Sequence, residues 1–141
     1  YTTELDELEG NYLFIDIGTN GELAIKAKGR LICVATAAGP ASEGANITCG
    51  MGSLEGAICG VTEDGNKFKL EVIGNGEPKG ICGSGLVDIM ALSLKRCLVE
   101  ETGLILVGQS IDITTEVDLI VLNQDDIREL QLAKSCIAAG I

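Results

Sequence analysis

The stretch LFIDIGTNGELAI, residues 13–25, constrains the fold of this chain more than any other segment. Two apolar runs flank a short polar segment that contains Asn20-Gly21, and Asn-Gly is a dipeptide typical of tight β-hairpin turns. A third apolar run, RLICVATAAG, follows a second glycine turn. The sequence therefore predicts an antiparallel three-stranded meander over residues 12–36, with the turn at residues 19–21 exposed.

The carboxylate of Asp16, at the end of the first strand, needs an explanation beyond the hairpin itself. A tight turn can direct several backbone N–H groups into one concavity, and Gly18 and Gly21 allow a ligand to approach the backbone closely. Thr19 and Asn20 add polar side chains, so this turn suits a phosphate chain. Because Asp16 would repel phosphate, this hypothesis needs a Mg²⁺ ion between them. The alternative is an ordinary hairpin in which Asp16 caps the turn through a side-chain hydrogen bond.

A second glycine-rich stretch, KGICGSGLVDIM, precedes a predicted helix. Gly83 and Gly85 leave the N–H groups at its start free to bind an anion, with Ser84 as the predicted cap. The alternative is that these glycines only permit close packing of the helix. The predicted buried face of this helix consists of Leu86, Met90, Leu94 and Cys97.

The segment GPASEGANITCGMGS is predicted to be a loop with a short helix after Pro40. Glu43 in this loop could contact a nucleotide or a metal-bound water, or it could be an acid in the first helical turn. Two strands, LEGAICGVTED and KFKLEVIG, follow with a turn at residues 64–66, and a short strand is expected in VDLIVL.

A final helix is predicted to begin at Asn123. Asn is a favourable N-cap residue, and Asp125 and Asp126 in the first turn complement the helix dipole. Gly140 is the expected end of this helix. Its predicted buried face consists of Ile127, Leu130, Ala133 and Ile137.

The composition narrows the classes of partner. The chain has 141 residues, enough for one domain or part of one, and its net charge is −11, with 10 basic and 21 acidic residues. Such a surface repels phosphate backbones and anionic lipids, so neither nucleic acid nor a membrane is an expected partner. No apolar run approaches the roughly 18 residues of a membrane span. Because the chain starts at Tyr1 and not at Met, we expect it to be a fragment of a longer protein, with residues 1–10 as a linker or trailing end.

The cysteines point to a reducing, cytoplasmic environment. No two of them form a C-x-x-C pair and the chain has no histidine, which excludes the usual zinc patterns and argues against a ferredoxin-type cluster in this segment. Several lie in apolar stretches, so we expect free thiols and not a disulfide framework. The absence of histidine also excludes a Ser/His/Asp set and leaves a cysteine nucleophile without its usual base. The six cysteines are Cys33, Cys49, Cys59, Cys82, Cys97 and Cys136.

Beyond residue 10, four stretches occur in a fixed order: LFIDIGTNGELAI, ATAAGPASEGANITCGM, KGICGSGLVDIMA and DIRELQLAKSCIAAGI. In order and spacing they resemble the C-terminal region of the reductive activators of corrinoid proteins. Members of that family combine a ferredoxin-like iron–sulfur domain with an ATPase region of the ASKHA superfamily, which includes actin, sugar kinases and heat-shock chaperones. The resemblance covers nearly the whole chain beyond the linker.

The resemblance implies an α/β fold: a ribonuclease-H-like half of an actin-like ATPase domain, with a mixed sheet that opens with the meander and is flanked by helices. Residues 11–141 would be part of the second half, without the segment that usually holds adenosine. Asp16 would bind Mg²⁺, and the residues expected to contact the nucleotide phosphates would be Gly18, Thr19, Asn20, Gly21, Gly83, Ser84 and Gly85. Glu22 matches the family motif without an assigned role.

The function implied is part of an ATP-dependent reductive activator of a corrinoid (cobalamin) protein. ATP and Mg²⁺ would be the cofactors here, and the iron–sulfur cluster would belong to a separate N-terminal domain. The partner would be a corrinoid protein, and this reading leaves room for a homodimer. The longer protein would hydrolyse ATP, whereas residues 1–141 alone would not, and would bind nucleotide no more tightly than about millimolar. The alternative is a non-catalytic interaction module that retains the nucleotide turn as a relic.

Overall fold

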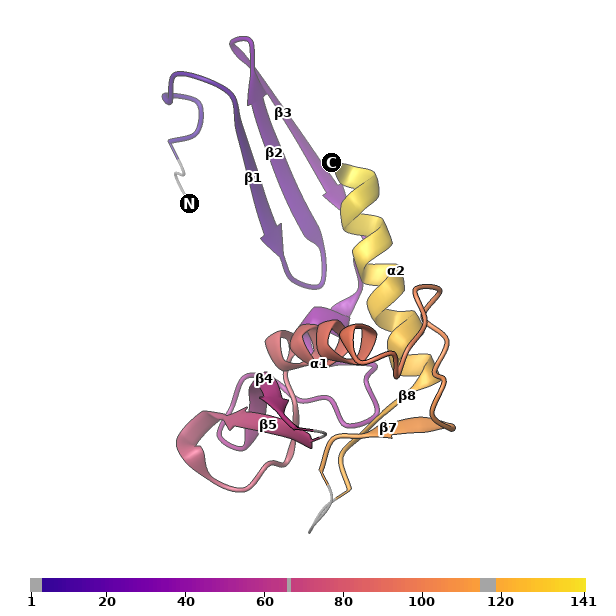
Figure 1. The fold of residues 1–141 in the computed structure, drawn as a ribbon. Helices are drawn as coiled ribbons and strands as arrows, with labels where there is room; N and C mark the ends of the chain where they lie inside the picture. The colour runs from indigo at the N-terminus through magenta and orange to yellow at the C-terminus, as the bar shows by residue number, and fades with distance from the viewer. Residues whose placement is uncertain (1–3, 66, 115–118) are drawn as a thin grey trace.

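The computed structural model describes residues 4–65, 67–114 and 119–141, and it confirms an α/β fold (Figure 1). Its elements in chain order are β1 (Tyr12–Ile17), β2 (Gly21–Ala27), β3 (Arg30–Thr36), the 3-10 helix η1 (Pro40–Glu43), β4 (Ala57–Asp64), β5 (Lys67–Val72), the 3-10 helix η2 (Ile73–Asn75), β6 (Gly80–Ile81), α1 (Gly83–Lys95), β7 (Ser110–Asp112), β8 (Val121–Asn123) and α2 (Gln124–Gly140). The strands are divided among three sheets, of orders β1-β2-β3, β5-β4-β6 and β7-β8. The second sheet contains both an antiparallel and a parallel strand pair, whereas the meander forms a separate sheet.

The predicted meander is confirmed. β2 is antiparallel to both β1 and β3, and the register places Asp16 directly opposite Glu22 and Ile17 opposite Gly21. In the connecting turn Thr19 and Asn20 are exposed as expected, whereas Gly21 is buried. Ile137 of α2 lies 3.5 Å from where a Gly21 side chain would begin, which explains that burial.

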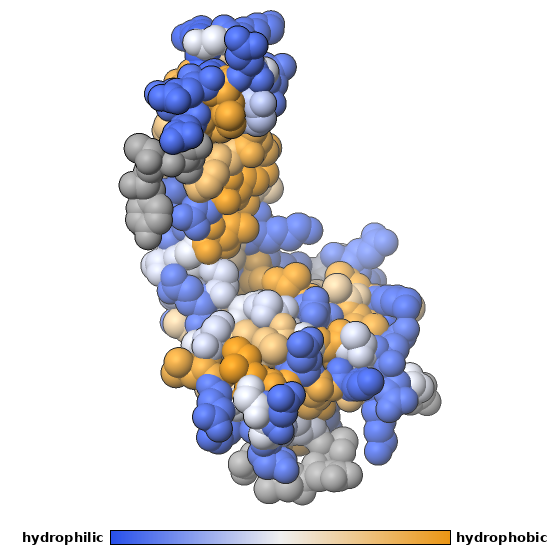
Figure 2. Space-filling model, turned by 90° about the vertical axis from the view of Figure 1, so that its left-hand side faces the viewer, coloured by the Kyte–Doolittle hydropathy of each residue, from blue (hydrophilic) through white to orange (hydrophobic). Residues whose placement is uncertain are grey.

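One face of the meander is mostly apolar and only partly covered. Near the turn it packs against the last residues of α2, which leaves Leu23 only 2% exposed. Farther from the turn, α2 no longer covers this face, and Ile32 on it is 60% exposed. Figure 2 shows apolar side chains gathered over the meander. The large apolar side chains that the register places on this face are Leu13, Ile15, Ile17, Leu23, Ile25, Ile32 and Val34.

The second sheet and α1 form the main core. β4 lies at its centre, antiparallel to β5 and parallel to the two-residue β6, and α1 packs against β4. The strand pair was expected, whereas β6 was not, because its two residues lie in a glycine-rich loop without a periodic pattern. The predicted turn at residues 64–66 falls between β4 and β5, and residue 66 lies outside the described residues.

The face of α1 that is buried differs from the predicted one. Leu86 is buried as expected and Met90 packs at the margin of the core, but Leu94 is 39% exposed and Cys97 is exposed beyond the helix end. The correction has a physical reason: apolar residues lie on most sides of this helix, so spacing alone cannot select one face. The side chains buried instead are Ile89, Leu92 and Ser93.

The start of α2 is as predicted. The Asn123 side chain accepts a hydrogen bond from the Asp126 N–H, and the Asp126 carboxylate accepts one from the Asn123 N–H, which forms a capping box. Ile127 and Ala133 are buried, and Leu130 packs against the core. α2 then extends from the β7–β8 pair to the meander (Figure 1), and so connects the two parts of the fold.

The strand expected in VDLIVL is present as β8, although residues 117 and 118 lie outside the described residues. Its antiparallel partner β7 was not predicted. Residues 4–10 contain turns and neither helix nor strand, and Leu5 among them is buried.

Candidate functional site

The turn between β1 and β2 is fixed by three hydrogen bonds. Within it, the Gly18 N–H donates to the carbonyl oxygen of Asn20 at 2.9 Å. From the residue before η1, the Gly39 N–H donates to the Thr19 carbonyl oxygen at 2.9 Å, and from η1 itself the Ser42 hydroxyl donates to the Gly18 carbonyl oxygen at 3.2 Å. The conformation of the turn is therefore set by its own chain, before any ligand is bound.

Glu43, the last residue of η1, contacts this turn directly. Its Oε1 accepts a hydrogen bond from the Thr19 N–H at 3.0 Å, and its Oε2 accepts one from the Thr19 hydroxyl at 2.8 Å. A Cβ placed on Gly18 would lie 3.2 Å from the same Oε1, so the carboxylate lies over the open side of this glycine. Glu43 does lie in the first turn of a short helix, as one sequence interpretation held. Its contact with Thr19 was not predicted, because 24 residues separate the two.

Two carboxylates face each other beside the turn. Asp16 on β1 and Glu22 on β2 are directly opposite in the register, which puts both side chains on one face of the meander with Cβ atoms about 5 Å apart. Both are exposed, and neither makes a side-chain hydrogen bond or salt bridge with any residue that the structure describes. The hydrogen bond by which Asp16 would cap the turn is thus not found among these residues. Like charges in this position repel, and a bound cation would relieve the repulsion.

Cys82 lies at the start of α1, the helix end at which an anion was expected to bind. Cys82, and not Ser84, is the N-cap residue. Burial raises the pKa of the Cys82 thiol, but a hydrogen bond with the Ser84 hydroxyl and one from the Gly85 N–H, among others, outweigh this effect and leave the pKa below its ordinary value. The Ser84 hydroxyl itself donates to the Cys59 carbonyl oxygen at 2.7 Å. The predicted cap thus binds the neighbouring strand instead.

Gly83 and Gly85 are required by packing. A Cβ on Gly83 would lie 1.7 Å from the Ser42 carbonyl oxygen, and one on Gly85 would lie 2.1 Å from the Ile58 carbonyl oxygen. These contacts are what the close-packing alternative requires. They also show that η1 lies between two of the predicted stretches, because Ser42 touches both Gly18 of the hairpin turn and Gly83 of α1.

The six cysteines are unpaired, and their burial predicts the order in which they react. Cys33 and Cys97 are exposed, whereas Cys82 is 1% exposed and donates to the Ile58 carbonyl oxygen at 3.3 Å. In the native protein we expect an aromatic disulfide reagent to modify Cys33 and Cys97 first and Cys82 last, at a rate lower by about tenfold or more because the thiol must first be uncovered. Peptide mapping after timed labelling measures this, and rapid labelling of Cys82 would contradict it.

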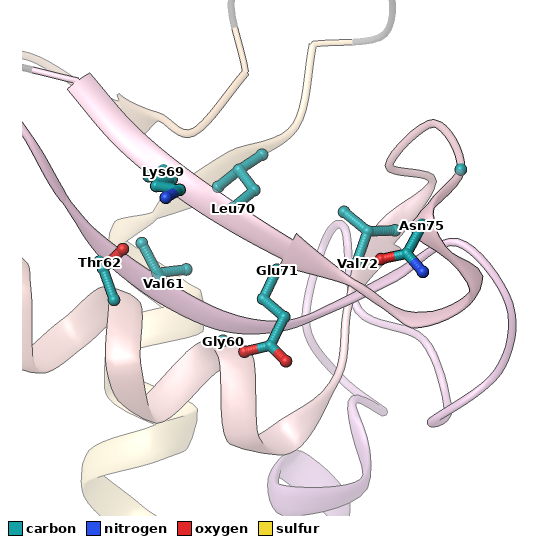
Figure 3. A pocket seen from close by; sticks show the side chains of 9 residues that line it. Gly60, Val61, Thr62, Lys69, Leu70, Glu71, Val72 and Asn75 are labelled. Carbon is teal, nitrogen blue, oxygen red and sulfur yellow. The ribbon is translucent and has the colours of Figure 1, made fainter.

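A separate open cavity of about 480 Å³ lies on the β4–β5 pair (Figure 3). Its lining includes Thr62 of β4, Lys69 and Glu71 of β5, and Asn75 of η2. None of the residues predicted to bind nucleotide or metal lines it, so this cavity and the hairpin turn are different sites.

No group of three or more His, Cys, Asp or Glu side chains in residues 4–65, 67–114 and 119–141 is arranged to hold a metal ion. Among the same residues, no helix has the length and apolar character to cross a membrane.

Comparison with known proteins decides the family. Residues 10–141 match the family model described as the C-terminal domain of RACo, the ASKHA domain. The chain belongs to this family. The ASKHA assignment that the four sequence stretches suggested is therefore confirmed, and with it the fold class.

Individual relatives agree with this assignment. The chain is 36% identical to the corrinoid activation enzyme RamQ of Eubacterium limosum over an alignment of 152 positions, which covers 91% of this chain and 26% of RamQ. It is 34% identical to a [Co(II) methylated amine-specific corrinoid protein] reductase of Methanosarcina barkeri, over 72% of this chain and 24% of the reductase. A solved structure of a reductive activator for corrinoid, iron–sulfur protein superimposes with a TM-score of 0.86 at 34% identity, covering 98% of this chain and 25% of that one. The chain thus spans about a quarter of the length of these relatives.

Proposed function

We propose that this ASKHA domain supplies a phosphate-binding hairpin to an ATP-dependent enzyme that reductively activates a corrinoid protein. The names of its relatives support the reaction, and the hairpin supports the role within it. The observation that carries the proposal is the pair of donors on Thr19, its N–H and its hydroxyl, which already bind the two oxygens of a carboxylate. Donors that hold one anion in this manner are suited to hold phosphate oxygens.

The residues beside the turn fit a Mg²⁺ ion. Asp16 and Glu22 offer hard oxygen ligands on one face of the sheet, and no described residue neutralises them. Asp16 would hold the ion, directly or through water, and when bound the ion would offset the charge of the phosphates. Gly18, Asn20 and Gly21 would complete the contacts with the phosphates by exposing backbone at the turn. Gly83, Ser84 and Gly85 remain a second predicted contact, although their packing accounts for the two glycines without a ligand.

The remainder of the proposal concerns the longer protein. An iron–sulfur cluster in a separate N-terminal domain would supply the electron, a corrinoid protein would accept it, and the enzyme would act in the cytoplasm, with a homodimer as a further proposal. Because members of this superfamily hold ATP from two halves, residues 1–141 alone would bind nucleotide weakly and would not hydrolyse it.

The test is the substitution Asp16→Asn in the full-length protein, which removes the charge and keeps the shape of the side chain. We expect the rate of ATP-dependent reduction of the corrinoid protein, followed by the loss of its cob(II)alamin absorbance, to fall by about a hundredfold. The midpoint of unfolding should change little, because Asp16 is exposed.

Asp112→Asn is the matched control, since Asp112 is an exposed aspartate on β7. It should leave the rate of corrinoid reduction unchanged. A wild-type rate in Asp16→Asn would remove Asp16 from the proposed site.

A further inference from the structure

Glu43 occupies the same donors that the proposed function assigns to phosphate. Both of its carboxylate oxygens are engaged, one by the Thr19 N–H at 3.0 Å and the other by the Thr19 hydroxyl at 2.8 Å. Oε1 also fills the space next to Gly18 that the absence of a side chain leaves open. An incoming phosphate group would need the same two donors and the same space, so the two anions exclude each other.

A second contact of the same kind shows what makes this one displaceable. Asp126 also binds a threonine through both donors, the Thr48 N–H at 2.7 Å and the Thr48 hydroxyl at 3.0 Å. Asp126 is 1% exposed and fixed on its other oxygen by the Asn123 N–H, so it is a permanent part of the core. Glu43 and Thr19 are exposed, and the Glu43 carboxylate accepts only from Thr19 among the described residues. The Glu43 carboxylate can therefore move from the turn into water, and no buried polar group loses its hydrogen-bond partner.

The 3-10 helix η1, which carries Glu43, also contacts α1. Glu43 follows Ser42 in η1, and Ser42 donates to the Gly18 carbonyl oxygen while its own carbonyl oxygen packs against Gly83, the first residue of α1. In Figure 1, η1 lies beside α1, below the hairpin turn. Ser42 therefore joins the hairpin turn to the start of α1 by direct contacts.

We propose that Glu43 is a built-in competitor that occupies the Thr19 donors in the nucleotide-free protein and is displaced by a phosphate group of the nucleotide. This inference rests on the proposed function of the hairpin and adds its regulation. While Glu43 occupies the donors, the apparent affinity for nucleotide equals the intrinsic affinity multiplied by the fraction of molecules in which the donors are free. Displacement then links nucleotide binding to the position of η1.

The test is a calorimetric titration of the full-length protein with MgATP, at physiological ionic strength, in the wild type and in Glu43→Ala. We expect Glu43→Ala to bind MgATP about tenfold more tightly, the gain that corresponds to donors free in about one wild-type molecule in ten. Glu43→Gln keeps the shape but not the charge of the side chain, and its affinity should lie between the two.

Glu77→Ala controls for the general loss of one negative charge, because Glu77 is an exposed residue in the loop before β6. Its affinity for MgATP should match that of the wild type. Equal or weaker binding in Glu43→Ala, with clear binding in the wild type, would overturn the competition while leaving the proposed function intact. An equal gain in Glu77→Ala would also overturn it. No binding of MgATP by any of the proteins would overturn the proposed function together with the competition.

Discussion

Asp126→Ala is expected to destabilise the domain by about 3–4 kcal/mol, a large share of the stability of a typical domain. The Asp126 carboxylate is buried and accepts three hydrogen bonds, two from Thr48 and one from the Asn123 N–H. Alanine would leave those donors without the acceptor that satisfies them, and it would also break the capping box that starts α2. Urea denaturation followed by circular dichroism gives the change in the free energy of unfolding.

Asp125→Ala is the control for this prediction. Asp125 is the preceding residue in the same helical turn, carries the same charge and is exposed. Its loss should cost no more than about 1 kcal/mol, the contribution of a surface carboxylate to the helix dipole. If both substitutions lowered the free energy of unfolding by about the same amount, the network around Thr48 would not be the source of the stability.

Gly83→Ala and Gly85→Ala are each expected to destabilise the domain by about 3 kcal/mol or more, because the added methyl group would overlap backbone atoms. The nearest atoms are carbonyl oxygens, 1.7 Å from a Cβ at Gly83 and 2.1 Å from one at Gly85, and neither can rotate away as a side chain could. α1 would have to move as a body, away from Ser42 of η1 and Ile58 of β4. Thermal unfolding measures the effect.

Gly76→Ala is the matched control, since nothing lies within 4 Å of a Cβ at that position and its φ is −95°. It should be neutral or slightly stabilising. A folded Gly83→Ala protein of wild-type stability that has lost nucleotide binding would instead favour a phosphate contact at the start of α1 over a packing role.

The parts of the fold that the sequence predicts are those with local signals. The meander follows from the Asn-Gly turn and its flanking apolar runs, and the start of α2 follows from Asn123 and the two acids after it. The buried face of α1 was missed because Val87 and Leu94 continue the apolar pattern around the helix, and only packing against β4 decides between the faces. β6 and β7 are too short to show a period.

The candidate site was predictable as a list of residues but not as an arrangement. Asp16, Thr19 and the turn glycines come from one continuous motif, so spacing was enough to find them. The contact between Glu43 and Thr19 depends on how η1 folds back on the hairpin turn, and a single sequence carries no signal for it. For the same reason, the sequence could not show that Cys82 and not Ser84 caps α1.

The central claim, that the hairpin turn binds the phosphates of MgATP, is tested most directly by hydrogen–deuterium exchange of the full-length protein. We expect saturating MgATP to slow exchange in the peptide that spans residues 13–25, and Asp16→Asn to remove that protection. ATP with a metal chelator should protect the peptide much less, since the proposed site needs the cation to offset Asp16 and Glu22. Unchanged exchange in residues 13–25, under conditions in which the protein binds MgATP and protects other segments, would contradict the account.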